Sequence, residues 1–205
     1  MKNKQFDKKF VPSRYLQRFF SLNSLEEMAR YKLFPNIKEI TESMSMFCCV
    51  MNVIPKLLPE GSWERSLEKS HVVVCGDGHT PRTAGLFAFL TKAECYSIDP
   101  QMREKDYSGI RRLDVRRDII ENFKLKIPDD EVVYILMPHS HAPIQETWDS
   151  VTAKNKWLIS MPCCRHDKLD RPFLSLKDPY NISKKNTLEI YSSFVSMLNI
   201  NVDSV

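Results

Sequence analysis

Short apolar segments alternate with helical patterns along the chain from His71 onwards, and this alternation constrains the fold more than any other feature. The apolar segments are rich in β-branched residues, which is typical of buried strands. They predict strands over residues 72–75, 95–99, 111–115, 132–137, 157–161 and 188–194. The helical patterns predict helices over residues 81–92, 117–123 and 143–153. Strands separated by helices indicate a doubly wound, mostly parallel α/β sheet with helices on both faces.

The N-terminal part of the chain has helical patterns and no strand pattern. Ser24 followed by Glu27 predicts a capping box at the start of one helix. A longer helical segment, rich in Met, Phe, Ile and Val, covers residues 37–58. We therefore expect an N-terminal helical segment over residues 1–65 and a sheet domain over residues 66–205.

Composition excludes several classes of protein. Hydrophobic residues make up 42% of the 205 residues and charged residues 27%, which is ordinary for a folded chain with a real core. No apolar run reaches the roughly eighteen residues that a membrane helix needs. The basic N-terminus leads into no apolar segment, so we expect no secretory signal. A net charge of +4 permits an anionic partner such as RNA without demanding one.

Cysteine usage indicates a reducing compartment. The cysteines are Cys48, Cys49, Cys75, Cys95, Cys163 and Cys164. Two adjacent pairs make a poor disulfide framework, so we interpret all of them as reduced thiols. This interpretation predicts an intracellular, cytoplasmic protein.

A glycine-rich turn follows the first predicted strand and reads CGDGHTPRTAG over residues 75–85. Gly76 and Gly78 let the backbone turn tightly and let a ligand approach closely. Thr80 suits the N-cap of the next helix, and Pro81 suits its first position. The turn lies at the carboxyl edge of the predicted sheet, where open α/β sheets bind their ligands.

An acid, Asp99, ends the second predicted strand about twenty residues after the glycine turn. A carboxylate in this place can accept hydrogen bonds from both hydroxyls of a ribose. Two glycines that only make a turn, and an acid that only caps a segment, would explain the pattern without a ligand. The strand, the helix start and the spacing together favour a nucleoside ligand. A dinucleotide fingerprint needs a third glycine where this chain has Pro81, so NAD is the weaker alternative.

The turn and the acid resemble motif I and the following acid of the class I S-adenosylmethionine (SAM) dependent methyltransferases. The resemblance covers roughly residues 72–161 and implies a Rossmann-like fold with SAM as the cofactor. It implies that Gly76 and Gly78 line the methionine end of SAM. It also implies that Asp99 holds the ribose and that Asp114, near the end of the third strand, lies by the adenine.

One departure from that family pattern bears on SAM binding. The family usually has an acid two residues before the first glycine, where this chain has Val74. Asp77, inside the turn, is the candidate substitute, and Thr80 completes the predicted cofactor-binding residues. The missing acid also favours an alternative, a methyltransferase-like binding or scaffold module that has lost catalysis.

Two further turns fall at the same edge of the predicted sheet. The turn after the fourth strand contains His139 and His141, and the turn after the fifth contains Cys163 and Cys164. A branch of the family has similar turns and includes the tRNA ribose 2′-O-methyltransferases of the Trm-thirteen type. The match is partial because the Cys-Gly-Asp expected after His139 is absent. The resemblance implies a substrate that enters between His139 and Cys163, with RNA or protein as open choices of acceptor.

His139, His141 and Cys163 are therefore the candidate catalytic residues. Histidine titrates near neutral pH and suits a general base, and a cysteine beside a histidine can act as a nucleophile. Cys163, Cys164 and His166, with His139 or His141, also offer zinc ligands, but adjacent cysteines rarely serve one structural zinc and no C-x-x-C occurs, so no metal is predicted. Packing of the two cysteines in a core is the remaining alternative.

Overall fold

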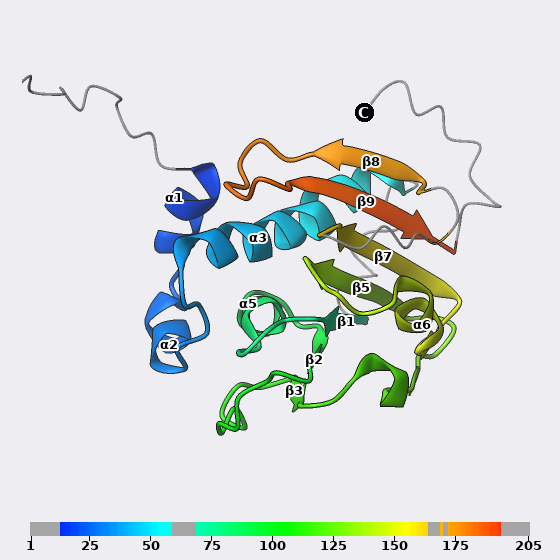
Figure 1. Cartoon of the computed structure of the whole chain (residues 1–205), viewed down its shortest axis with the longest axis horizontal. Helices are drawn as coiled ribbons and strands as arrows, with labels where there is room; N and C mark the ends of the chain where they lie inside the picture. Colours follow the sequence, from blue (N-terminus) through cyan, green and yellow to red (C-terminus); the bar gives the residue numbers. More distant parts are fainter. Residues whose placement is uncertain (1–12, 59–68, 164–168, 170–171, 194–205) are drawn as a thin grey trace, which may run out of the picture.

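A seven-stranded mixed sheet forms the centre of the computed structural model (Figure 1). The structure describes residues 13–58, 69–163, 169 and 172–193. The strand order is β3-β2-β1-β5-β7-β9-β8. The strands are β1 (Ser70–Cys75), β2 (Glu94–Ile98), β3 (Leu113–Arg116), β5 (Val132–Pro138), β7 (Asn155–Met161), β8 (Leu174–Lys177) and β9 (Thr187–Ser192). The predicted α/β class is confirmed.

The direction of the strands fixes where the loops meet. The strands β3, β2, β1, β5 and β7 are mutually parallel, and β9 runs antiparallel to both β7 and β8. From β1 the chain first adds β2 and β3 on one side and then returns to add β5 on the other. The loops that leave the carboxyl ends of β1 and β5 therefore lie next to each other at the point where the strand order reverses.

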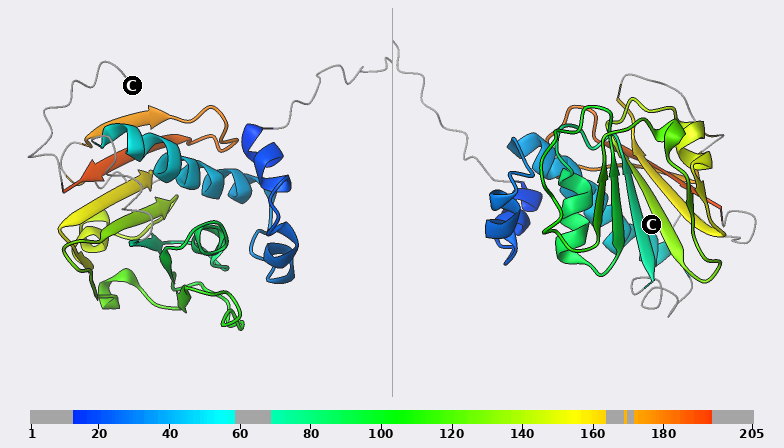
Figure 2. Two further views of the ribbon diagram at one scale, coloured as in Figure 1. Left: turned by 180° about the vertical axis from the view of Figure 1, so that it is seen from behind. Right: turned by 90° about the horizontal axis from the view of Figure 1, so that it is seen from below.

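Helices cover both faces of the sheet (Figure 2). The α-helices are α1 (Arg14–Phe20), α2 (Leu25–Arg30), α3 (Ile37–Cys48), α5 (Arg82–Leu90) and α6 (Ile144–Asp149). The remaining elements are the π-helical turn η1 (Cys49–Val53), the 3-10 turns η2 (Ile54–Leu57) and η3 (Ile120–Asn122), and a small parallel pair of β4 (Leu125–Lys126) with β6 (Val151–Thr152). No helix among these residues is both long and apolar enough to cross a membrane.

Alternate residues of each central strand face different helices. Val72 and Val74 of β1 belong to the core shared with α3 and α5. Val73 and Cys75 belong to a second core with residues of η3 and α6 on the opposite face. Because both faces are covered, the strands read as continuous apolar runs, which is typical of buried parallel sheets.

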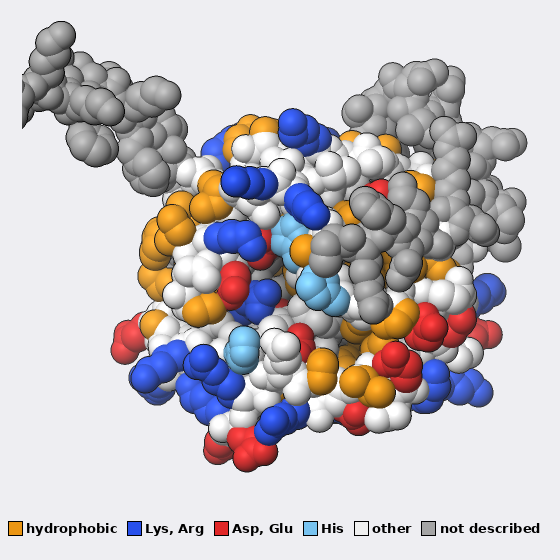
Figure 3. Space-filling model, in the orientation of Figure 1, with side chains coloured by type: hydrophobic (Ala, Val, Ile, Leu, Met, Phe, Trp, Pro, Cys, Tyr) orange, Lys and Arg blue, Asp and Glu red, His pale blue; other side chains and the backbone are white. Residues whose placement is uncertain are grey.

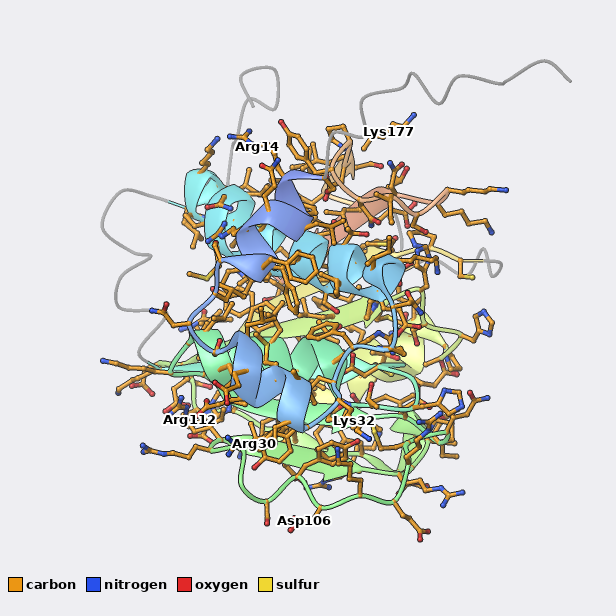
Figure 4. All side chains as sticks on the ribbon, turned by 90° about the vertical axis from the view of Figure 1, so that its left-hand side faces the viewer. Arg14, Arg30, Lys32, Asp106, Arg112 and Lys177 are labelled. Atoms are coloured by element: carbon orange, nitrogen blue, oxygen red, sulfur yellow. The ribbon has the colours of Figure 1, made fainter. Side chains whose placement is uncertain are left out.

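The predicted N-terminal helical segment is present, and it shares its core with the sheet. Phe19 of α1, Met28 of α2 and Met44 of α3 lie in the same cluster of buried side chains as Leu86 of α5 and Trp157 of β7. Figure 4 looks onto α1 and α2, which are marked by the labels Arg14 and Arg30. These two helices lie on the outer side of α3 and α5.

Several local predictions are wrong. Ser24 stands at the N-cap of α2 but makes no side-chain cap, because its backbone (φ −84°, ψ 6°) is not in the extended conformation that an N-cap uses. The helix predicted over residues 143–153 ends at Asp149, because the β-branched pair Val151 and Thr152 forms β6. The segment 117–123 contains only the short turn η3. The sixth predicted strand is antiparallel to β7, and β8 was not predicted.

Candidate functional site

A cavity of about 500 Å³ opens at the carboxyl edge of the sheet, where the strand order reverses. Its walls are the turns that follow β1, β2, β3 and β5, together with the start of α3. Histidine side chains lie in the middle of the face shown in Figure 3, with lysine and arginine side chains beside them. The size and position of the cavity are those of ligand sites in open α/β sheets.

The two glycines of the turn after β1 adopt backbone conformations that other residues resist. Gly76 has φ +78° and Gly78 has φ +82°. A Cβ atom on Gly76 would lie 2.3 Å from Ser140 Oγ, so the turn after β5 packs directly against this glycine. A Cβ atom on Gly78 would lie 2.4 Å from Nη1 of Arg82. Ser140 and Arg82 therefore leave no room for a side chain at these two positions of the turn.

Asp77, between the two glycines, points into the protein. Its buried carboxylate accepts hydrogen bonds from the N–H groups of Thr83 (2.9 Å) and Ala84 (3.1 Å) and from the Ser97 hydroxyl (2.9 Å). Burial raises the pKa of this carboxyl, and the charge of Arg82 opposes the shift. Asp77 therefore caps the N-terminus of α5 and does not line the cavity.

Thr80 does not have the capping role that the sequence predicts. The helix α5 begins at Arg82 with Pro81 at the N-cap position. The Thr80 hydroxyl donates instead to the carbonyl of Leu33 (2.5 Å), which joins the turn to the end of the α2 region. Thr80 also lies outside the cavity wall.

Asp99 lies directly after β2, at the end of the second strand as the sequence predicts, and it lines the cavity. Its Oδ2 accepts the N–H of Gly78 (2.7 Å), and its Oδ1 accepts the N–H of Gln101 (2.7 Å). A carboxylate has about four acceptor positions, so the two that these bonds leave can serve a ligand. The glycine turn and the acid are thus joined by a direct hydrogen bond.

Asp114 lies outside the cavity wall. It stands within β3, its side chain is 44% exposed, and it pairs with Arg116 at 2.8 Å. Asp118 and Ile119, which follow β3, line the cavity instead. Ile119 is 46% exposed, so its apolar side chain is open to a ligand in the cavity. Asp118 and Ile119 could have been found in the sequence from their position just after a strand. The sequence instead predicts a helix over this segment.

The turn after β5 brings His139 against two distant elements. Its Nε2 lies 3.0 Å from the Ser183 hydroxyl, in the β8–β9 loop, and 3.1 Å from Glu42 Oε1, on α3. His139 has φ +54°, its side chain is only 13% exposed, and Nδ1 is buried without a partner among the described residues. His141 is exposed and also lines the cavity.

The cysteine turn lies beside this region. Cys163 is a partly exposed free thiol, and its carbonyl accepts a hydrogen bond from the Lys185 ammonium. Cys163 is not part of the cavity wall, and Cys164 and His166 lie outside the described residues. The residues that the structure describes contain no cluster of three His, Cys, Asp or Glu side chains suited to a metal. Burial raises the pKa of the Cys75 thiol to about 12.

Sequence reasoning missed the contribution of α3. Lys38, Glu39 and Glu42, from its first turns, line the cavity. Lys38 Nζ lies 2.8 Å from Glu42 Oε1, and Arg82 Nε lies 3.4 Å from Glu39 Oε2. The available signal was Glu42 itself, a charged residue on the apolar side of this helix.

No protein-family model matches this chain, and no curated protein matches it. Its site is therefore interpreted from its own geometry and chemistry.

Proposed function

We propose that this protein is a SAM-dependent methyltransferase that binds SAM in the cavity at the carboxyl edge of the sheet. The observation that carries the proposal is the pair formed by the glycine turn and Asp99, joined by the Gly78–Asp99 hydrogen bond at the point where the strand order reverses. The methyl acceptor is RNA or protein.

The residues of the cavity suit the parts of SAM. Asp99 keeps acceptor positions for the two ribose hydroxyls. The exposed Ile119 offers an apolar surface to the adenine. At the α3 end, Arg82 lies 3.4 Å from Glu39, and the two signs of charge in this pair suit the zwitterionic amino-acid end of SAM.

The capping of α5 favours SAM over a dinucleotide. Dinucleotides place their diphosphate at the N-terminus of the helix that follows the first strand. In this protein the N–H groups of Thr83 and Ala84 already bind the Asp77 carboxylate. A diphosphate would have to displace this buried acid, whereas SAM carries no phosphate.

The strand order also differs from the dinucleotide-binding order, because β9 runs antiparallel between β7 and β8, whereas the dinucleotide-binding sheet is mostly parallel.

When bound, SAM would supply an electrophilic methyl group for direct displacement by the acceptor. Most of the catalysis expected from this chain is therefore positioning. The backbone of the glycine turn and Asp99 would orient the cofactor, and the turn that contains His139 and His141 would face the acceptor.

The alternative is a scaffold module that has lost catalysis, and Val74 favours it. This residue is fully buried within β1, and Asp77, the candidate substitute for the missing acid, is committed to α5. A module of this kind binds its partner without methyl transfer.

Thermal unfolding with SAM, S-adenosylhomocysteine and NAD⁺ tests the proposal. A ligand that binds only the folded state adds about 2.7 kcal/mol at a hundred times its Kd, or roughly 5–10 °C in Tm. We expect a shift with SAM and S-adenosylhomocysteine and none with NAD⁺. A shift with NAD⁺ alone would favour a dinucleotide enzyme, and no shift with any of the three would favour the scaffold.

A further inference from the structure

We propose that Glu42 is a positioning residue that holds His139 as the general base of the reaction. This inference rests on the proposed methyl transfer and adds two things to it. It assigns a role to α3 in the chemistry, and it restricts the acceptor to a group that must lose a proton.

The contact between the two residues is close and protected from water. Glu42 Oε1 lies 3.1 Å from His139 Nε2, and the side chains are 2% and 13% exposed. Both residues line the cavity, although they come from α3 and from the turn after β5. A carboxylate that lies this close in a site of low dielectric constant orients an imidazole strongly.

Glu42 is expected to be ionised. Burial alone would raise the pKa of Glu42, but its interactions with His139 and Lys38 outweigh burial and hold the pKa below its usual value. Lys38 Nζ lies 2.8 Å from the same oxygen that faces His139. The Lys38 ammonium beside the same oxygen explains how a carboxylate is kept charged at 2% exposure.

An ionised Glu42 selects one tautomer of His139. A proton on Nε2 is favoured, because Nε2 lies 3.1 Å from the Glu42 carboxylate and 3.0 Å from the Ser183 hydroxyl, which can accept a hydrogen bond from it. Nδ1 then holds the lone pair. This nitrogen has no partner among the described residues, and because it is buried a substrate has to displace the atoms that cover it before it can accept a proton.

The backbone of His139 gives a second reason to assign a function. Its φ of +54° lies in the left-handed region, which is uncommon for residues other than glycine. Such conformations cluster at functional sites, where the surroundings hold them. Here Glu42 and Ser183 hold the imidazole from two sides.

The chemistry restricts the acceptor. A neutral amine or a thioether can attack a methyl sulfonium without a base. An acceptor that becomes nucleophilic only when it loses a proton needs a base. The acceptor passes its proton to His139 Nδ1 while its lone pair forms the bond to the methyl carbon. The electrons of the S–C bond return to sulfur, which leaves a neutral thioether, and His139 later releases the proton to water.

Nitrogen NMR of the wild-type protein, labelled with ¹⁵N-histidine, reports the tautomer without any substitution. We expect a protonated Nε2 and an unprotonated Nδ1 for His139. The opposite tautomer would overturn the proposal.

Transfer of tritiated methyl from SAM to the RNA, protein and small-molecule fractions of a cell extract tests the role of the pair. Glu42→Gln should lower kcat at least tenfold and leave KM for SAM within twofold. His139→Gln should lower kcat further, and the double variant should be no slower than His139→Gln, because Glu42 acts through His139. Glu42→Asp keeps the charge and should recover part of the rate if the Gln variant folds poorly.

Glu131→Gln is the matched control. Glu131 Oε2 lies 2.5 Å from His71 Nε2, so this variant removes a second Glu–His contact, one outside the cavity wall and at the opposite ends of the strands. It should change neither kcat nor KM.

Calorimetry with S-adenosylhomocysteine distinguishes a failure of the proposed function from a failure of the role proposed for Glu42. No binding to the wild type would remove the proposed function. Binding with normal transfer by Glu42→Gln, or additive losses in the double variant, would overturn the role of Glu42 alone. Binding without transfer by the wild type to any fraction would overturn the proposed methyl transfer together with the role of Glu42 and favour the scaffold. A tenfold loss of S-adenosylhomocysteine affinity in Glu42→Gln would overturn it as well and move Glu42 into the cofactor site.

Discussion

Asp99 is the residue on which the proposed cofactor site depends most. Asp99→Ala should weaken the binding of S-adenosylhomocysteine by about 1.5–3 kcal/mol, the usual worth of hydrogen bonds to a charged group. Calorimetry measures this directly. The variant should remain folded, at a cost of about 3 kcal/mol for the two lost bonds that Gly78 and Gln101 donate to this carboxylate.

Asp114→Ala is the companion variant, because the sequence resemblance assigns the adenine to Asp114. The half-exposed Asp114 pairs with Arg116 away from the cavity, so we expect its removal to leave the affinity unchanged. A large loss with Asp114→Ala and none with Asp99→Ala would contradict the site described above.

Glu42 makes a second prediction at the scale of single residues. Its pKa in the folded protein lies below the ordinary value of 4.5, so the unfolded chain binds its proton more readily. The stability that Glu42 contributes is therefore present above about pH 4.5 and is lost as the pH falls through the folded value. Urea unfolding of the wild type and of Glu42→Gln should give free energies that differ most near pH 6 and converge in acid. A difference that grows in acid would mean that the pKa is raised.

The residues that sequence reasoning found and those it missed differ in kind. Gly76, Gly78 and Asp99 were found because a turn after a strand and an acid after the next strand are local signals. The inward direction of Asp77 could not be predicted, because it depends on the N-terminus of α5 and on Ser97 of a neighbouring strand.

Among the elements, the turns after β1 and β5 are the pair whose contact shapes the cavity. Gly76→Ala should destabilise the protein by about 1–3 kcal/mol, because the new methyl group would meet Ser140 Oγ at 2.3 Å and the backbone has φ +78°. Chemical denaturation measures the loss. Adding Ser140→Gly should restore the stability that is lost to the clash with Ser140. The stability that is lost to the positive φ of residue 76 should not return.

A double-mutant cycle of Gly76→Ala and Ser140→Gly separates the clash with Ser140 from the strain of the positive φ. A coupling energy of about 0.5–3 kcal/mol between the two positions is expected for residues in direct contact. Additive effects would mean that the turns do not touch.

The arrangement of elements was predictable where periodicity is local and unpredictable where pairing is distant. The parallel strands up to β7 follow from apolar runs separated by helices, and they formed close to the predicted ranges. The antiparallel direction of β9 depends on its pairing with β7 and β8, for which the segment itself has no signal. The start of α3 enters the cavity for a similar reason, because packing against α5 and β5 places it there.

At the scale of the whole molecule, the N-terminal helices and the sheet form one packed unit. Met44 of α3 and Trp157 of β7 are both buried in the same core. We expect a fragment of residues 66–205 to lack a cooperative unfolding transition, because removal of α1 to α3 exposes this core to water. Circular dichroism during thermal unfolding checks this.

The full chain is the reference for that experiment. It should unfold in a single transition, and Met44→Ala should lower its stability by about 2–5 kcal/mol as judged by helical and sheet signals alike. A fragment that melts cooperatively would instead support a separate domain boundary near residue 66.

A crystal structure of the full chain with S-adenosylhomocysteine is the direct test of the proposed cofactor site. We expect density for the ligand in the cavity at the carboxyl edge, with its ribose hydroxyls within hydrogen-bond distance of the Asp99 carboxylate. We also expect the Asp77 carboxylate to stay on the N–H groups of Thr83 and Ala84. Ligand bound at another place, or an empty cavity at a saturating concentration of the ligand, would show that the cavity is not the cofactor site.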